Sequence, residues 1–487
     1  MSSNGTTSAK ESPAKGKASA LPRANGGRTN DVRDAHARHR ERASSEGPLE
    51  YPIIDATPAE EQASVARSTH ASVSHEEVSF EDVSRAKYRI MDGVQVTACE
   101  LSHNLSAMTE MELYFKREYQ LRTGSFKERG ARNALKLLSA AQREKGVIAA
   151  SAGNHALGLA YHGQDLGIPV TLVMPVFAPL TKVENCRSFG ANVIISGAHI
   201  GESMVVAKEI AEKQGLQYIN GYNDAAIIAG QGTAGLEILE QVPDVDAIIV
   251  PVGGGGLIAG VSLAVKTIQK NVQIIGVESV ACPSFSEAMK AGHPVPVEVT
   301  STLADGLAVP TVGATAFHVA RSRVNKMIQV REKDVAIAVL RLLEMEKAIV
   351  EGSGACGLAA LLANYLPELK GKKVVCLLCG GNIDLPVIGR VIERGLAADG
   401  RLVRFVVSVS DRPGGIAQLT TLIARVGASV KDIHHERAWQ ESDVMSVQIK
   451  CVVETRSRAH AEELRQALVE AGYPLKWGLD PNPPVIL

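Results

Sequence analysis

Between about residues 78 and 395, short apolar runs alternate with amphipathic stretches, and this alternation constrains the fold more than any other feature. Helical patterns such as Thr181–Phe189 and Met204–Gln214 each end at a glycine. The runs that predict strands are Val147–Ala150, Pro169–Met174, Ala191–Ile195, Ala247–Val252, Gln273–Val277 and Lys373–Leu378. The alternation predicts an α/β fold of open parallel sheets with flanking helices. Ligands of such sheets bind at the carboxyl ends of the strands, so the loops there are the candidate sites.

The pattern changes after about residue 400. The expected elements are a strand, a helix, two strands, a helix and a last short strand, at Leu402–Val409, Gly415–Arg425, Ser429–Arg437, Val444–Val453, Arg458–Glu470 and Pro474–Trp477. This β-α-β-β-α-β order is the split ferredoxin-like arrangement. We therefore expect a small domain over residues 400–478, separate from the α/β domain over 78–395.

The first 75 residues have a different composition. Residues 1–75 are rich in Ser, Ala, Lys, Arg, Glu and Gly, and Tyr51 is their only aromatic residue. Such a segment buries too little apolar surface to offset its ordering entropy, so it is predicted to be a disordered tail. It contains no signal-peptide apolar core. Basic residues outnumber acidic ones near its start, which leaves a mitochondrial transit peptide as the alternative to a cytoplasmic protein.

Charge and cysteine usage exclude several classes of function. The formal net charge is −1, from 52 basic and 53 acidic residues, so neither nucleic acid nor an anionic membrane is an expected partner. No apolar run approaches the roughly 20 residues that cross a bilayer. Seven scattered cysteines favour a reducing, cytoplasmic location over a disulfide framework. Cys376 and Cys379 have C-x-x-C spacing, but their apolar neighbours favour a buried strand over a redox pair.

Three loops carry the residues suited to chemistry. The first, Ser125–Gly130, contains Lys127, which by itself could be a surface lysine. The second, Ser151–His155, follows a predicted strand and opens a helix, where small residues let backbone N–H groups approach an anion; an ordinary N-cap turn is the alternative. The third, Val252–Leu257, contains four consecutive glycines, which cost more entropy than a structural turn requires. A phosphate cradle explains them better.

The third loop also fits a rival function. Gly254-x-Gly256-x-x-Ala259 matches the dinucleotide-binding pattern, and Glu278 ends the next strand, where a ribose-binding acid would be expected. That interpretation leaves the first two loops unexplained, whereas a cofactor with a phosphate monoester uses all three.

Four motifs in this order resemble one family. Ser125–Gly130, Ser151–His155, the tetraglycine and Cys379-Gly380-Gly381-Asn382 are similar to the fold-type II pyridoxal-phosphate enzymes of the threonine dehydratase and serine racemase group, over about residues 78–395. The resemblance implies a tryptophan-synthase-beta-like fold with two α/β lobes and pyridoxal 5′-phosphate as cofactor. It also implies the residues that hold the cofactor: Phe126, Lys127, Asn154, Gly253, Gly254, Gly255, Gly256, Leu257 and Cys379.

The resemblance assigns roles within this set. Lys127 would form the Schiff base and act as general base, and Asn154 would donate a hydrogen bond to the cofactor's 3′-oxygen. The thiol of Cys379 would face the pyridine nitrogen, which favours elimination of the β-hydroxyl. The substrate carboxylate would bind at Ser151, Ala152, Gly153, Asn154 and His155. The implied reaction converts L-threonine to 2-oxobutyrate, and L-serine to pyruvate, with release of ammonia.

Two departures from the relatives bear on the function. Serine racemases have a serine where this chain has Ala152, and that serine is the acid and base on the opposite face; dehydration is therefore preferred over racemisation. The cation site of metal-binding relatives maps to Glu278, Cys282 and Ser284. Because a hard divalent ion prefers charged oxygens, Ser284 weakens a divalent site, and a monovalent ion or a looser site is the alternative.

The C-terminal domain resembles an ACT module, the amino-acid-sensing fold. The resemblance implies that an amino-acid effector binds at the loop containing Asp411, Pro413, Gly414, Gly415 and Ile416. We expect regulation through this loop and a homo-oligomer, either a dimer or a tetramer. His434, His435 and Glu436 alternate in direction along a strand, so no metal role is assigned to them. A serine racemase with side dehydratase activity and a non-catalytic amino-acid sensor are the alternative functions.

Overall fold

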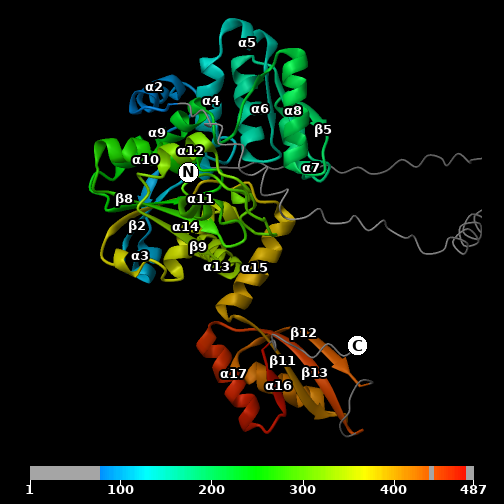
Figure 1. The fold of residues 1–487 in the computed structure, drawn as a ribbon. Helices are drawn as coiled ribbons and strands as arrows, with labels where there is room; N and C mark the ends of the chain where they lie inside the picture. Colours follow the sequence, from blue (N-terminus) through cyan, green and yellow to red (C-terminus); the bar gives the residue numbers. More distant parts are fainter. Residues whose placement is uncertain (1–76, 438–443, 479–487) are drawn as a thin grey trace, which may run out of the picture. The chain divides into compact units, whose positions relative to one another are not determined.

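The computed structural model describes residues 77–437 and 444–478 of the 487. The predicted disordered tail over residues 1–75 lies outside the described residues. Figure 1 shows two sheets with their helices in the first part of the described chain and a third, antiparallel sheet formed by the last elements.

The larger lobe is built on a six-stranded sheet. Its strands, in spatial order, are β1 (Cys99–Leu101), β2 (Glu112–Lys116), β10 (Lys373–Leu377), β7 (Ala247–Pro251), β8 (Gln273–Ser279) and β9 (Lys326–Val330). Strand β1 pairs antiparallel with β2, and all other pairs are parallel. The predicted parallel sheet is therefore confirmed, with one antiparallel strand at its edge.

The smaller lobe has a four-stranded sheet, parallel throughout. Its order is β5 (Asn192–Ile195), β4 (Val170–Met174), β3 (Val147–Ala150) and β6 (Gln217–Tyr218). Its helices include α4 (Lys127–Leu137), α5 (Ala140–Lys145), α6 (Asn154–Leu166), α7 (Leu180–Ser188) and α8 (Ile200–Gln214). The predicted strands and helices of this lobe agree with these bounds to within a few residues.

The larger lobe also contains nine α-helices of the described chain. They are α2 (Phe80–Ile90), α3 (His103–Thr109), α9 (Ala225–Gln241), α10 (Gly256–Ile268), α11 (Ser284–Ala291), α12 (Ala314–Ala320), α13 (Glu332–Arg341), α14 (Gly352–Leu362) and α15 (Leu385–Asp399). Shorter turns are the 3₁₀ segments η1 (Glu118–Gln120), η2 (Asp305–Leu307) and η4 (Pro367–Leu369), and a π segment, η3 (Leu342–Glu346). Among the described residues, no helix has both the length and the apolar character that crossing a bilayer requires.

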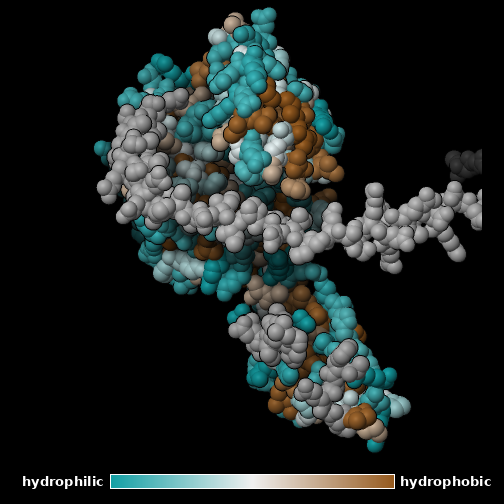
Figure 2. Space-filling model, turned by 45° about the vertical axis from the view of Figure 1, so that its right-hand side comes forward, coloured by the Kyte–Doolittle hydropathy of each residue, from teal (hydrophilic) through white to brown (hydrophobic). Residues whose placement is uncertain are grey.

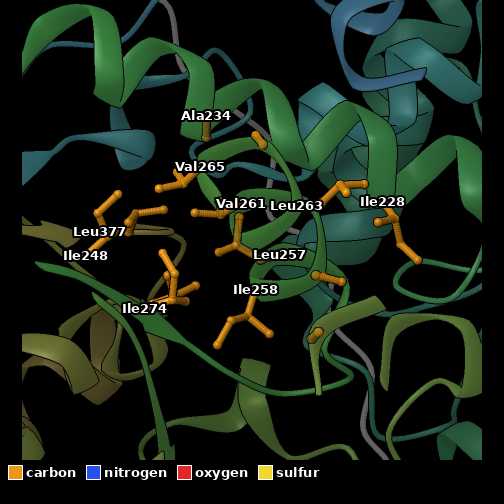
Figure 3. Close-up of a cluster of buried hydrophobic side chains, with 14 of the residues drawn as sticks. Ile228, Ala234, Ile248, Leu257, Ile258, Val261, Leu263, Val265, Ile274 and Leu377 are labelled. Atoms are coloured by element: carbon orange, nitrogen blue, oxygen red, sulfur yellow. The ribbon is translucent and has the colours of Figure 1, made fainter. Parts of the chain in front are cut away.

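Aliphatic side chains fill the core of the larger lobe. Every residue of β7 is buried, as expected for a central parallel strand covered on both faces. On one face, α10 packs against the sheet and α9 packs against α10, and the close-up of Figure 3 shows side chains of α10 beside those of the strands. Residues labelled there include Ile248, Ile274 and Leu377 from the sheet and Leu257, Ile258 and Val261 from α10. This packing holds the start of α10 at the carboxyl end of β7.

The last elements form the predicted β-α-β-β-α-β unit. They are β11 (Leu402–Ser410), α16 (Gly415–Val426), β12 (Ser429–Glu436), β13 (Ser446–Glu454), α17 (Arg458–Glu470) and β14 (Leu475–Trp477). The sheet is antiparallel, with the order β12-β13-β11-β14. Along β13, buried residues alternate with half-buried ones, since one face packs on the two helices. The ferredoxin-like prediction is confirmed.

Candidate active site

A cavity of about 820 Å³ lies at the carboxyl ends of strands from both lobes. All of the residues predicted to hold the cofactor or the substrate carboxylate line it. These residues come from loops that are far apart in sequence, after β3, after β7 and after β10, and from the start of α4. The structure thus brings the four sequence motifs together around one cavity.

Lys127 begins α4 and its side chain is half-buried in this cavity. The Nζ atom donates to the carbonyl oxygen of Gly221 at 2.6 Å and lies 5.1 Å from the centre of the Phe126 ring. Burial lowers the pKa of Lys127 to about 8, although Cys379 and Glu351 nearby act in the opposite direction. A lysine with this pKa is neutral in about a tenth of molecules at pH 7, far more than an ordinary lysine, and can act as a base or a nucleophile.

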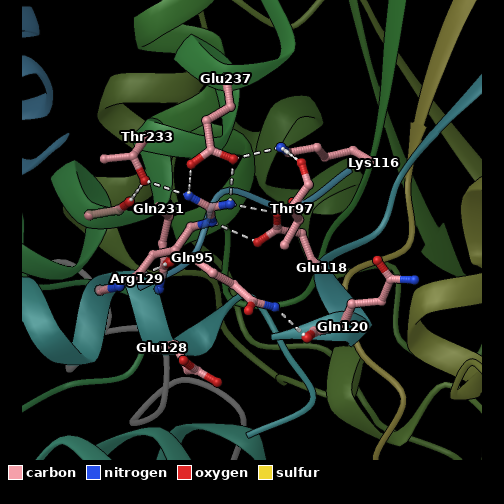
Figure 4. A network of polar contacts seen from close by, with 12 residues as sticks. Gln95, Thr97, Lys116, Glu118, Gln120, Glu128, Arg129, Gln231, Thr233 and Glu237 are labelled. Atoms are coloured by element: carbon pink, nitrogen blue, oxygen red, sulfur yellow. Dashed lines mark hydrogen bonds and ion pairs between the residues drawn. The ribbon is translucent and has the colours of Figure 1, made fainter. Parts of the chain in front are cut away.

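A buried ionic network holds the first turn of α4, the helix that begins at Lys127, in position (Figure 4). Arg129 donates to Glu118 and to Glu237, at 2.6–2.8 Å, and Lys116 donates to Glu237 at 2.5 Å. The side chains of these four residues are at most 5% exposed. Two cations therefore balance two carboxylates inside the protein, one turn from Lys127.

The glycine loop leaves no room for side chains. A Cβ atom at Gly254 would lie 2.3 Å from the ring of Tyr222, and one at Gly256 would lie 2.5 Å from the Tyr222 carbonyl oxygen. Gly255 has φ = +91°, which side-chain-bearing residues rarely adopt. No side chain caps the helix α10 that follows, so its first N–H groups are available to an anion. Leu257, in the first turn of α10, is buried.

The second loop, 151–155, joins β3 to α6 and also lacks a side-chain cap. Ser151 accepts a hydrogen bond from the backbone N–H of Gly153 at 3.3 Å, and Ala152 lines the cavity without any polar atom on its side chain. Burial, with a smaller effect from Lys127, lowers the pKa of His155 to about 3, so the imidazole is neutral at physiological pH. Its Nε2 lies 3.3 Å from the carbonyl oxygen of Ile219.

Several residues of the cavity escaped the sequence analysis. Glu351, just before α14, accepts a hydrogen bond from Asn154 Nδ2 at 2.8 Å, and burial raises its pKa to about 7. Ser353 is 1% exposed, and its hydroxyl has no hydrogen-bond partner among the described residues. Tyr222 packs under the glycine loop. Glu351 and Ser353 follow no predicted strand, and their only sequence signal is the short Glu-Gly-Ser-Gly run.

Cys379 ends the stretch after β10 and is 2% exposed. Its carbonyl oxygen accepts a hydrogen bond from the N–H of Phe126 at 3.0 Å, which ties the two loops together. Burial raises the pKa of the Cys379 thiol well above its ordinary value. Cys376 lies within β10 and both sulfurs are free thiols, in agreement with a buried strand and its end.

The residues proposed for a cation lie outside the cavity. Glu278 is fully buried, and its two carboxylate oxygens accept backbone N–H groups of Phe285 and Ser286, both at 3.0 Å, at the start of α11. Cys282 and Ser284 are buried beside it. No group of three or more His, Cys, Asp or Glu side chains suited to a metal occurs in the described part of the chain.

Comparison with known proteins identifies the family. Residues 90–380 match the protein family described as "Pyridoxal-phosphate dependent enzyme". The chain belongs to the pyridoxal-phosphate dependent enzymes. This pyridoxal-phosphate enzyme is 43% identical to an L-threonine ammonia-lyase of Thermotoga maritima over 399 residues, 82% of this chain and 99% of the relative. It is 41% identical to an L-threonine ammonia-lyase of Geobacter sulfurreducens, over 80% of this chain and 97% of the relative.

Solved structures of the family have the same fold as this pyridoxal-phosphate enzyme. The processed form of threonine deaminase isoform 2 from Solanum lycopersicum has a TM-score of 0.62 and 36% identity, over 65% of this chain and 93% of that chain. Maize serine racemase has a TM-score of 0.63 and 36% identity, over 66% of this chain and 99% of that chain. The likeness thus includes both enzyme types that the sequence motifs resemble.

Proposed function

We propose that this chain is an L-threonine ammonia-lyase that also accepts L-serine. It would eliminate water from the substrate, and hydrolysis of the resulting enamine would take up one water and release ammonia, which gives 2-oxobutyrate from threonine and pyruvate from serine. The observation that carries the proposal is that Lys127, Asn154 and the glycine loop line one cavity. The 43% identity with an L-threonine ammonia-lyase over nearly all of that relative supports the choice of substrate.

The cavity suits the cofactor of the family. The loop of glycines offers backbone N–H groups at a helix N-terminus, where a phosphate binds. The buried hydroxyl of Ser353 has no hydrogen-bond partner among the described residues, so it is available to a bound cofactor. We assign the cofactor to Lys127, Phe126, Asn154, Cys379 and residues 253–257. When bound, pyridoxal phosphate supplies a conjugated ring that accepts the electrons released as the substrate's Cα–H bond breaks.

Lys127 would both hold the cofactor and move the proton. Because its pKa is lowered to about 8, the neutral amine is accessible near physiological pH and can accept a proton from the substrate Cα at Nζ. The carbonyl oxygen of Gly221, 2.6 Å from Nζ, orients the amine. The loop Ser151–His155, which leads into α6, would bind the substrate carboxylate through the uncapped N–H groups at the start of that helix.

Two small side chains, those of Cys379 and Ala152, favour elimination over racemisation. The Cys379 thiol has a raised pKa, so it keeps its proton and would face the ring nitrogen as a neutral partner, without the charge that a carboxylate would supply. The side chain of Ala152 has no group that can deliver a proton to the face of the substrate Cα opposite Lys127. Elimination is therefore preferred over racemisation. The serine racemase alternative lacks its second acid, and a non-catalytic sensor would not need Lys127.

We also propose a three-part organisation: a tail over 1–75, a catalytic domain over 78–395 and an ACT regulatory domain over 400–478. In the last, Gly414 precedes α16 as its N-cap, with φ = +101°, and no side chain caps the helix, so its first N–H groups are available to an effector's carboxylate. Asp411 is paired with Arg437 Nη2 at 2.9 Å, and Ile416, in the first turn of α16, is 39% exposed. Pro413 and Gly415 complete the proposed effector loop.

We propose a homo-oligomer, a dimer or a tetramer, as ACT modules bind effectors at domain interfaces. Seven free cysteines fit a cytoplasmic compartment, with a mitochondrial one as the alternative. Because backbone N–H groups already satisfy both carboxylate oxygens of Glu278, a cation there would be monovalent or loosely held.

A product assay tests the proposed function. The full-length protein is loaded with pyridoxal phosphate and supplied with L-threonine or L-serine, and 2-oxo acid, ammonia and D-amino acid are measured. We expect 2-oxo acid and ammonia in equal amounts. A protein that binds the cofactor but forms no 2-oxo acid from either substrate would show that the proposal is wrong.

A further inference from the structure

The side chain of Asn154 is held from both sides in the cavity. Its Nδ2 donates to Glu351 Oε1 at 2.8 Å, and its Oδ1 accepts from Asn382 Nδ2, also at 2.8 Å. Asn382 uses the same amide nitrogen to donate to the carbonyl oxygen of Thr123 at 2.6 Å. Asn154 is the first residue of α6, Glu351 lies just before α14 and Asn382 lies after β10, so only the tertiary fold brings them together.

The chemistry of the partners leaves one orientation for the Asn154 amide. A carboxylate only accepts hydrogen bonds, so Nδ2 of Asn154 must face Glu351. The Asn382 amide nitrogen only donates, so the Asn154 oxygen must face it. An amide nitrogen carries two protons, and Glu351 takes one of them. The second proton is left for a ligand in the cavity, which Asn154 and Glu351 both line.

Two glycines, Gly380 and Gly124, make this arrangement sterically feasible. A Cβ atom at Gly380 would lie 2.5 Å from Oε1 of Glu351 and 3.1 Å from Nδ2 of Asn154, where it would separate the two. A Cβ atom at Gly124 would lie 2.5 Å from Oδ1 of Asn382. Both glycines therefore leave space for the hydrogen-bonded chain from Asn382 through Asn154 to Glu351.

We propose that Glu351 is a positioning residue that orients the Asn154 amide so that its second N–H meets the phenolic oxygen of the bound cofactor. The proposal rests on the assignment of Asn154 to the cofactor made above. Glu351 acts through Asn154 and takes no part in bond making or breaking. Asn382 also orients the Asn154 amide, by donating a hydrogen bond to its oxygen.

The hold of Glu351 on Asn154 depends on its charge. Burial and the nearby carboxylate of Asp305 raise the Glu351 pKa to about 7, whereas Asn154 and Lys182 act in the opposite direction. The other titratable groups facing it are Lys127, Cys379 and Cys356. Below about pH 7 the carboxyl gains a proton and can itself donate, so Asn382 alone then fixes the direction of the amide. Asn154 is therefore held from both sides only as the pH rises through about 7.

A double-mutant cycle on the full-length holoenzyme tests the proposal. The variants are Glu351→Gln, Asn154→Ala and the two combined, and the readouts are the pyridoxal-phosphate dissociation constant, the absorbance maximum of the bound cofactor and its pH profile. We expect Glu351→Gln to weaken cofactor binding by about tenfold and to remove the pH-dependent change near pH 7. In the Asn154→Ala background, the same change should have no further effect on cofactor binding.

Controls separate this result from loss of folding and from failure of the proposed function. Glu346 is a largely buried carboxylate of the same lobe, outside the cavity, and Glu346→Gln should leave the spectrum and affinity unchanged. Asn382→Ala gives an independent test, and it should shift the cofactor spectrum in the same direction as Glu351→Gln. Effects of Glu351→Gln and Asn154→Ala that multiply, or a Glu351→Gln spectrum and pH profile like the wild type, would overturn the inference. If the wild-type protein bound no pyridoxal phosphate, the function itself would be wrong.

Discussion

The guanidinium of Arg129 donates to Glu118 through two nitrogens, each at 2.7 Å, and neither side chain is exposed to solvent. Arg129 lies two residues after Lys127 on α4, while Glu118 belongs to the turn after β2 and Glu237 to α9. The pairing therefore ties the first turn of α4, and with it Lys127, to two other elements.

Arg129→Met should destabilise the protein strongly. It leaves Glu118 and Glu237 buried with only Lys116 to balance them, and breaking a buried ion pair in this way costs about 3–5 kcal/mol. The free energy of unfolding, measured in urea, checks this. Arg85→Met is the control, because Arg85 pairs with Glu81 on the surface, both more than 60% exposed, and its loss should cost less than about 1 kcal/mol. Equal effects of the two changes would contradict the interpretation.

Lys127→Ala should abolish turnover and the absorbance of the covalently held cofactor. Loss of the general base alone slows a reaction by about 10²–10⁴-fold. Steady-state assays and an absorbance scan measure the two effects. Lys136→Ala, at the other end of α4 and paired with Asp92 Oδ2 at 2.5 Å, should keep both. Activity of the Lys127 variant within tenfold of the wild type would exclude the assigned role.

Ala152→Ser should raise racemisation relative to elimination. The new hydroxyl would stand in the cavity at the start of α6, where it can exchange a proton with the face of Cα opposite Lys127. The ratio of D-serine to pyruvate formed from L-serine is the measurement, by chiral chromatography. The unmodified protein should form only traces of D-serine. Comparable amounts of D-serine and pyruvate from it would favour the serine racemase alternative.

Removal of the residues after Asp399 should leave cofactor binding and elimination in place and abolish the response to an amino-acid effector. Coupling between such sites is typically worth about 1–3 kcal/mol, or 5–150-fold in affinity. The rate is titrated with isoleucine, valine, serine and threonine, with the oligomer size followed in parallel. If truncation changes only the oligomer and no amino acid affects the full-length enzyme, the domain has an assembly role alone.

Ile416→Asp tests the effector loop within the intact chain. A carboxylate in the first turn of α16 is compatible with the helix dipole, so the fold should be retained, but it would compete with the effector's carboxylate. Gly414 is a poorer target, because its φ of +101° would strain any side-chain-bearing residue. An effector response equal to that of the wild type would move the binding site elsewhere.

Local sequence patterns were enough to predict many of the strands, helices and motif loops of this protein. Strand β3 and helix α17 have the predicted bounds, because apolar periodicity and glycine stops act over a few residues. The three loops and Cys379 were also recognisable, since each combines a short motif with a preceding strand or a following helix. The rule that parallel strands present their carboxyl ends at one edge of a sheet explains why the loops after β7 and β10 meet, whereas β3 belongs to the other sheet and its loop is brought to the cavity by the packing of the two lobes.

The tertiary structure decided what depends on distant partners. Strand β10 inserts between β2 and β7, and β6 joins a second sheet, which no local pattern specifies. Glu351 meets Asn154 across 197 positions of the sequence, and Arg129 meets Glu237 across 108. A buried carboxylate is stabilised only by the donors that folding brings to it, and a sequence does not state which donors those are. The ionic network and the orientation of the Asn154 amide therefore belong to the folded chain alone.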